Sequence, residues 1–412
     1  MSRVMQLMVV VFLIITGFMA FPPSALTLPA NCVEGEQARG AIYRICMPTT
    51  VPWNGDLVLY AHGYVAPDEP VGIPEDQLFL PDGTYIPESI NELGYAFATT
   101  SYSKNGLAVR EGIKDIRELV RIFEKTVADV PRRVYLIGAS EGGQITALAI
   151  EQFPEEFSGG MALCGPIGNF RRHINYRGDF RVVFDYFFPG VLPPSPVAIP
   201  DYVIANWDNY YMGRIAYSMG KDPVATSELL AVTRAAIDPS DLSSIVKTVL
   251  GTLWFNVVAT NNAVEVLNGQ PFDNQDRLYV GSSNDVELNR RVERFRAAPS
   301  ASAQIAAHYE TSGQLERPLV TLHNTLDPIV PYWHEPLYGE KILASGSGNL
   351  YRHIPVFRYG HCNFKASETL AAFAILVSMA AGQEAFGAEG VLPGAGAQAE
   401  FLDIIEKYSA VR

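Results

Sequence analysis

The stretch "RRVYLIGASEGGQITALAI" (132–150) decides the fold of this chain. Its first part is a short apolar run, typical of a strand covered on both faces, and its second part is expected to be a helix. Between them lies "GASEGG" (138–143), which places Ser140 in the spacing G-x-S-x-G. The stretch therefore predicts a strand, a tight turn at Ser140 and a helix, with glycines that let the backbones approach closely.

The same alternation of strands and helices extends to both sides of this turn. Apolar positions at helical spacing predict a helix over 109–129. Further strands are predicted over 40–48, 55–64, 94–102 and 159–166, and the alternation resumes with one strand within each of the stretches 317–331 and 352–364. Strands that alternate with helices indicate an α/β fold with a mostly parallel central sheet and helices on both faces.

The alternation stops over residues 168–316, which are helical or irregular in pattern and rich in aromatic residues. We interpret this segment as a large helical cap or lid inserted between a first part of the core (31–167) and a second part (317–412). Its aromatic side chains would suit an apolar or aromatic acyl group, although such rings also form a cap's own core. The expected substrate-binding residues are Phe184, Phe187, Phe188, Trp207 and Trp254.

The net charge of the chain and the pattern of residues 1–30 indicate which partners and which cellular location to expect. The net charge of −13 over 412 residues argues against a nucleic-acid partner. Residues 1–30 have one Arg, a mostly apolar run over 4–21 and then small residues, the order of a secretory signal peptide. This predicts a secreted or periplasmic protein; the alternative is a membrane tether formed by an uncleaved run 4–21, which would be the protein's sole membrane contact.

A serine hydroxyl becomes a nucleophile when a histidine takes its proton, a carboxylate holds that histidine and N–H groups stabilise the oxyanion. His361 is expected to be the base because it lies on a loop after the last predicted strand. Asp327 follows the preceding strand and is favoured as the acid over Asp273 and Asp285. The backbone N–H groups of Tyr64 and Glu141 are expected to form the oxyanion hole.

The order Ser140, Asp327, His361 and the motifs "AHGY", "GASEGG", "DPIVP" and "YGHC" resemble the α/β-hydrolase superfamily. The likeness covers about 50–166 and 317–385, and points to a secreted carboxylesterase- or lipase-like enzyme with a helical cap. It implies an acyl-enzyme mechanism on an ester, amide or thioester, without metal or organic cofactor. The apolar cap favours a serine carboxylic ester hydrolase that acts on a small or polymeric ester. Glu141 departs from the usual pattern. Its carboxylate is expected to face solvent; the alternative is that it lies close to the site and repels acidic substrates.

Two other functions remain open. An exported serine peptidase of the same fold, similar to aminopeptidases or prolyl oligopeptidases, would need a charged anchor such as Glu141, Asp285 or Arg171 with Arg172. A non-catalytic binding protein on a hydrolase scaffold is disfavoured, because a binding module has no use for matched Ser, Asp and His residues.

The four cysteines are an even number, and an exported protein can oxidise them. Cys32 and Cys46 flank a predicted hairpin, and we expect them to pair. Cys164 with Cys362 would then tie the loop of His361 to the sheet; the alternative for this second pair is two buried free thiols.

Overall fold

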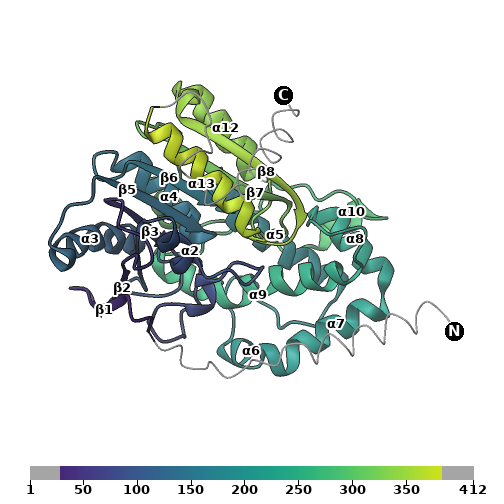
Figure 1. Ribbon diagram of the computed structural model, residues 1–412. Coiled ribbons are helices and arrows are strands. Elements are labelled where there is room, and N and C mark those ends of the chain that lie inside the picture. The colour runs from purple at the N-terminus through teal and green to yellow at the C-terminus, as the bar shows by residue number, and fades with distance from the viewer. Residues whose placement is uncertain (1–27, 383–412) are drawn as a thin grey trace. The chain divides into compact units, whose positions relative to one another are not determined.

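The computed structural model describes residues 28–382, which form two compact units (Figure 1). The sheet unit contains Pro29–Phe170 and continues from Gln304 onward, and the helical unit contains Arg171–Ala303. The predicted signal peptide or anchor lies outside the described residues, apart from residues 28–30. Within 28–382, no helix is both long enough and apolar enough to cross a membrane.

The sheet unit is built on an eight-stranded sheet in the order β1-β2-β4-β3-β5-β6-β7-β8. The antiparallel pairs are β1 with β2 and β2 with β4, and every other neighbouring pair is parallel. The strands are β1 (Cys32–Glu36), β2 (Ile42–Cys46), β3 (Asp56–Ala61), β4 (Ala96–Thr100), β5 (Arg133–Ala139), β6 (Gly159–Leu163), β7 (Leu319–Leu326) and β8 (Tyr351–Tyr359). The predicted α/β architecture with a mostly parallel sheet is confirmed.

Helices cover both faces of this sheet, which explains why its central strands are apolar throughout. Every residue of β3, β4 and β6 is buried. A side chain at Gly159 would meet Leu376 of α13, whereas one at Gly160 would meet Ile150 of α4. Because successive residues of a strand face opposite sides, α4 and α13 pack on opposite faces of the sheet.

The longest helix on the α4 side is α3, whose Gly112 lies against Ile145 of α4. It covers Val109–Val127, close to the predicted 109–129, and turns its apolar residues to the core. The helices of the sheet unit are the short 3-10 helix η1 (Glu75–Leu78), α2 (Ile86–Glu92), α3 (Val109–Val127), α4 (Glu141–Gln152), α12 (His334–Ser345), the 3-10 helix η3 (Gly348–Leu350) and α13 (Ala366–Ala380).

The helical unit has a charged residue in its core. Arg181 is 1% exposed, pairs with Asp185 at 2.9 Å and donates to the side chain of Asn256 and the carbonyl of Pro193. Its helices are α5 (Phe170–Phe187), α6 (Asp201–Ala205), the π-helix η2 (Trp207–Tyr211), α7 (Met212–Lys221), α8 (Pro223–Thr233), α9 (Ser243–Val266) and α10 (Asp285–Arg291), with α11 (Pro299–His308) passing into the sheet unit.

The units divide at slightly different positions from the predicted insertion 168–316. Residues 304–316 belong to the sheet unit, because the ring of Tyr309 stacks on Phe170 and the hydroxyl of Thr311 donates to the carbonyl of Ile167 at 2.6 Å. The aromatic, irregular pattern of this segment carries no sign of these contacts.

Candidate active site

The turn between β5 and α4 holds Ser140 in an unusual backbone conformation. Its φ is 57° and its ψ −118°, a region that L-residues with a side chain rarely occupy. A Cβ at Gly138 would lie 2.1 Å from the carbonyl oxygen of Gly142, and one at Gly142 would lie 2.0 Å from that of Ala61. Both glycines are therefore required for the strand and the helix to approach closely at this turn.

Ser140, His361 and Asp327 form a continuous chain of hydrogen bonds. The Nε2 atom of His361 lies 2.8 Å from the Ser140 hydroxyl oxygen, and its Nδ1 atom lies 2.7 Å from Oδ2 of Asp327. His361 follows β8, and Asp327 follows β7, as the sequence predicts. In this arrangement the imidazole can accept the serine proton while the carboxylate fixes its tautomer.

Asp327 is held as a buried carboxylate. Its Oδ1 atom accepts hydrogen bonds from the backbone N–H groups of Ile329 (2.8 Å) and Val330 (2.9 Å). Burial alone would raise the pKa of Asp327, but the charge of His361 and hydrogen bonds with His323 and His361 outweigh it and lower the pKa to about 2. The carboxyl group is therefore ionised at neutral pH, as an orienting acid must be.

Both expected disulfides are present, so all four cysteines are paired. Cys32–Cys46 joins directly opposed residues of β1 and β2. Cys164–Cys362 joins the residue after β6 to the residue after His361, with the Cα atoms 5.4 Å apart. Cys164, His361 and Cys362 lie close enough to resemble a metal-ligand group, but both sulfurs are in the disulfide and are not thiolate ligands.

The loop after β3 lies against Ser140 and is held by Gln77, which no sequence motif marks. A Cβ at Gly63 would lie 3.2 Å from the Cβ atom of Ser140. The Gly63 N–H donates to Oε1 of Gln77 at 2.7 Å, and Nε2 of Gln77 donates to the Tyr64 carbonyl at 3.3 Å. The Gly63 N–H is used in this way, and the Tyr64 N–H stays the predicted oxyanion donor.

Glu141 contributes the second candidate donor through its backbone N–H, since it is the first residue of α4 and the first N–H groups of a helix lack helical acceptors. Its side chain does not face solvent, so that expectation is wrong. Glu141 is 7% exposed, and its Oε1 atom accepts the backbone N–H of Ala108 at 2.9 Å. Ala108 is the N-cap of α3, and its N–H has no acceptor within the helix, so the inward-facing carboxylate of Glu141 satisfies it.

A second group of buried polar side chains lies beside Asp327, and it includes His323, a residue inside strand β7. Nδ1 of His323 on β7 lies 2.9 Å from Oε1 of Glu335 on α12. Nε2 of His323 lies 2.8 Å from the Val330 carbonyl oxygen and 3.6 Å from Oδ2 of Asp327. The sequence feature that could have pointed to His323 is the spacing "HNTLD", in which His323 lies four residues before Asp327.

The five aromatic residues expected to bind substrate lie in the helical unit. Phe184, Phe188 and Trp207 are buried, with the rings of Phe184 and Phe188 5.1 Å apart. Phe187 and Trp254 are partly exposed. Their role in substrate binding stays a prediction.

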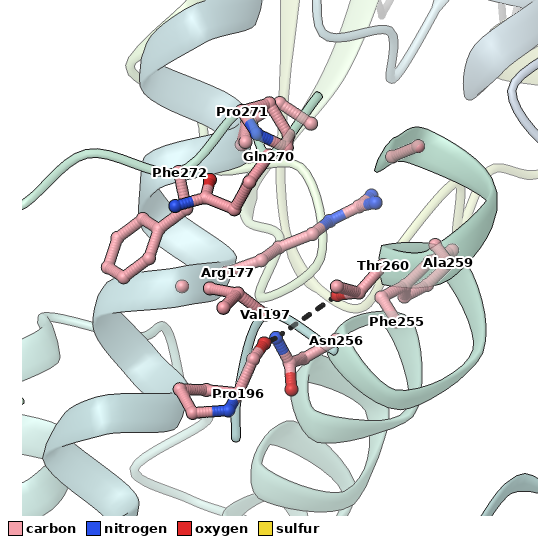
Figure 2. Close-up of a pocket in the computed structure, with 13 residues that line it drawn as sticks. Arg177, Pro196, Val197, Phe255, Asn256, Ala259, Thr260, Gln270, Pro271 and Phe272 are labelled. Atoms are coloured by element: carbon pink, nitrogen blue, oxygen red, sulfur yellow. Dashed lines mark hydrogen bonds between the residues drawn. The ribbon is translucent and has the colours of Figure 1, made fainter. Parts of the chain in front are cut away.

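Figure 2 shows a pocket in the helical unit, between α5, α9 and the segment that contains Pro271 and Phe272. Asn256 is one of the lining residues and donates to the Pro196 carbonyl at 3.1 Å. The cavity has a volume of about 40 Å³. This is room for one or two water molecules and far below the size of a typical ligand site, so the pocket is not where an ester would bind.

No protein-family model matches the sequence, and neither does any curated protein. Several solved structures resemble the chain distantly. An esterase from Aspergillus oryzae has a TM-score of 0.44 and 13% identity over 85% of this chain and 79% of its own. Candida antarctica lipase A in its closed state has a TM-score of 0.43 and 14% identity over 91% and 84%.

Acylaminoacyl peptidase from Pyrococcus horikoshii has a TM-score of 0.40 and 12% identity over 80% of this chain, which spans 37% of the peptidase. Likenesses this distant do not decide between esters and peptides. The assignment of the fold rests on the sheet order, on the strained turn between β5 and α4, and on the loop after β3 that lies against Ser140. This chain has the α/β-hydrolase fold.

Proposed function

We propose that the protein is a serine hydrolase that cleaves carboxylic esters through an acyl-enzyme intermediate. The observation that carries the proposal is the position of the His361 ring, which lies within hydrogen-bond distance of both the Ser140 hydroxyl and the Asp327 carboxylate. Support also comes from the strained backbone of Ser140, which is typical of a nucleophile on a strand-to-helix turn.

In this mechanism the hydroxyl oxygen of Ser140 attacks the ester carbonyl carbon while Nε2 of His361 takes the hydroxyl proton. Asp327 holds the Nδ1–H of His361 and stabilises the imidazolium. The amides of Tyr64 and Glu141 donate to the oxyanion of the tetrahedral intermediate. His361 then gives its proton to the leaving alcohol, and a water activated by the same imidazole releases the acid from Ser140.

An ester substrate is favoured over a peptide because three of the four charged residues considered as anchors for a peptide terminus have other hydrogen-bond partners. Glu141 accepts from the Ala108 amide. Asp285 accepts from the backbone N–H and hydroxyl of Ser282. Arg171 donates to the side chain and carbonyl of Ser302. An apolar or aromatic acyl group is proposed on the aromatic composition of residues 168–316.

We also propose that the protein is exported to the periplasm or the extracellular space. Two disulfides support this location, because they persist in oxidising compartments and are rare in the cytosol. The signal-peptide pattern of residues 1–30 supports it independently.

The test compares kcat/KM for p-nitrophenyl esters from acetate to palmitate with kcat/KM for peptidyl p-nitroanilides. Ser140→Ala is the inactive variant, and Ser158→Ala, a change outside the site, is the control for substitution itself. The proposal expects ester cleavage that disappears in Ser140→Ala and persists in Ser158→Ala. Faster cleavage of the anilides would identify a peptidase instead, and ester cleavage that survives in Ser140→Ala would refute the assigned nucleophile.

A further inference from the structure

The contacts of His323 require this buried ring to carry a positive charge. His323 is 0% exposed, and its two nitrogens face a carboxylate oxygen of Glu335 and the carbonyl oxygen of Val330. A carbonyl and an ionised carboxylate only accept hydrogen bonds, whereas a neutral imidazole has a single N–H. Both contacts are satisfied at once only when both ring nitrogens are protonated.

Glu335 has the partners that keep it ionised opposite this ring. Its Oε2 atom accepts hydroxyl hydrogen bonds from Thr321 (2.8 Å) and Tyr351 (3.1 Å) and lies 3.0 Å from Nδ1 of His353. Burial alone would raise the pKa of Glu335, but the charge of His353 and the hydrogen bond with His323 outweigh burial and lower it. The buried pair therefore carries one negative and one positive charge.

The groups around the ring agree with this charge. The titratable groups that face His323 are Asp327 and Tyr332 from the loop after β7 and Glu335 from α12; beyond Glu335 lie His353 and Tyr351 from β8. Burial alone would lower the pKa of His323. Hydrogen bonds and charges from Asp327 and Glu335 outweigh burial and raise the pKa of His323 to about 10.

This charged ring reaches the candidate active site through a single oxygen atom. Oδ2 of Asp327 lies 3.6 Å from Nε2 of His323 and 2.7 Å from Nδ1 of His361, so the two imidazoles flank the same carboxylate oxygen. His323 also holds the acid loop, because it donates to the carbonyl of Val330 while the N–H of Val330 donates to Asp327.

We propose that His323 is a positioning residue of the hydrolase site, whose fixed positive charge offsets the Asp327 carboxylate and keeps His361 available as a base at neutral pH. The inference rests on the proposed function. A buried carboxylate alone would stabilise protonated His361, and a protonated His361 cannot accept the proton of Ser140. The positive charge of His323 beside the same oxygen of Asp327 weakens that stabilisation. The Glu335 carboxylate balances the buried positive charge of His323.

The size of the effect follows from the distance. Since both rings contact one oxygen, their nearest nitrogens are at most about 6 Å apart. At an effective dielectric constant of about 20, two unit charges at this separation shift each other's titration midpoint by about two pH units. In the neutral variant His323→Gln, the midpoint of the His361 titration should therefore rise by about one to two units, the lower figure applying if Glu335 takes up a proton.

The experiment follows the imidazole nitrogens of the full-length protein by ¹⁵N NMR across pH 5–9. The chain has seven histidines, and His323→Gln and His361→Gln assign the two signals. In the wild type, His323 should stay doubly protonated throughout. In His323→Gln the His361 titration should move upward, and the acidic limb of the kcat/KM profile on the best ester should move with it. His308→Gln removes a histidine elsewhere in the sheet unit and should leave the His361 titration unchanged.

A singly protonated His323 ring in the wild type near pH 7 would overturn the proposal, and this result needs no variant to fold. A His361 titration that does not move in folded His323→Gln would overturn it as well, even if kcat fell, because a purely structural role predicts that pattern. The NMR titration requires no substrate. A protein that cleaves no ester would therefore contradict the proposed function while the charge of His323 is still decided by the spectra.

Discussion

Gln77 is predicted to control the oxyanion hole although it touches no substrate in the proposed mechanism. Its side chain accepts the Gly63 N–H and donates to the Tyr64 carbonyl, and so fixes the peptide between them. That peptide carries the Tyr64 N–H. The substitution Gln77→Leu keeps a side chain of similar length and removes both hydrogen bonds.

Two effects of different size are expected from Gln77→Leu. Leaving the partly buried Gly63 N–H without its acceptor should lower the free energy of unfolding by about 1–3 kcal/mol. Complete loss of one oxyanion donor costs about 10²–10³ in kcat. Because the Tyr64 amide is loosened rather than deleted, a fall of about 10–100-fold is expected. KM should change little, since the oxyanion forms only in the transition state.

The assay measures kcat and KM with the best p-nitrophenyl ester and the free energy of unfolding in urea. Gln37→Leu is the matched control, because the buried Gln37 amide donates to the Asp115 carbonyl at 2.9 Å and its oxygen accepts from Thr100, away from Ser140. The control should lose stability and keep its kcat. If Gln77→Leu lost stability and also kept its kcat, Gln77 would be a structural residue and the assigned role of the Tyr64 amide would fail.

Three further predictions concern the sheet unit. Opening the disulfide Cys164–Cys362, by mild reduction or by the double substitution Cys164→Ser with Cys362→Ser, should lower kcat while the sheet unit is still folded. The control Cys32→Ser with Cys46→Ser should lower stability alone. Unchanged activity with Cys164–Cys362 shown to be open would contradict this prediction. Gly138→Ala should lower the Tm and abolish activity because its Cβ meets the Gly142 carbonyl, while Gly72→Ala, which meets nothing within 4 Å, should do neither in thermal melts and ester assays. The pKa of His323 is raised to about 10, so the contribution of this residue to stability is complete below about pH 6.5 and is lost as the pH rises towards 10. Urea unfolding at several pH values should therefore show that the free energy of unfolding declines more steeply with pH for the wild type than for His323→Gln. Parallel declines would refute the positive charge of His323.

The sequence predicts the sheet and the positions of Ser140, Asp327 and His361 because each depends on local pattern. Short apolar runs mark the strands; Ser140 and Asp327 directly follow strands, and His361 lies two residues after one. The supporting residues have no such signal. Gln77 lies in a proline-rich segment that reads only as a loop, and its partners are 14 and 13 residues away.

Long-range contacts also explain why the orientation expected for Glu141 is wrong and why no local pattern marks His323. Glu141 is a charged residue at a helix start, which ordinarily faces water, and only the docking of α3 beside α4 brings the Ala108 amide to it. His323 reads as one residue of a strand. The proposed role of His323 depends on its contact with Glu335, which lies twelve residues later in the sequence on a separate helix. Such pairs are specified by tertiary packing rather than by local periodicity.

The disulfide Cys164–Cys362 has a topological consequence for the whole chain. It spans 198 residues, and the helical unit Arg171–Ala303 lies entirely inside the covalent ring that it closes. A protease that cuts the backbone once within that unit would leave Ser140 on one fragment and Asp327 with His361 on the other. The two fragments would remain joined, migrating as a single species until a reductant is added. Nicking in an oxidising environment therefore does not by itself separate the nucleophile from its base.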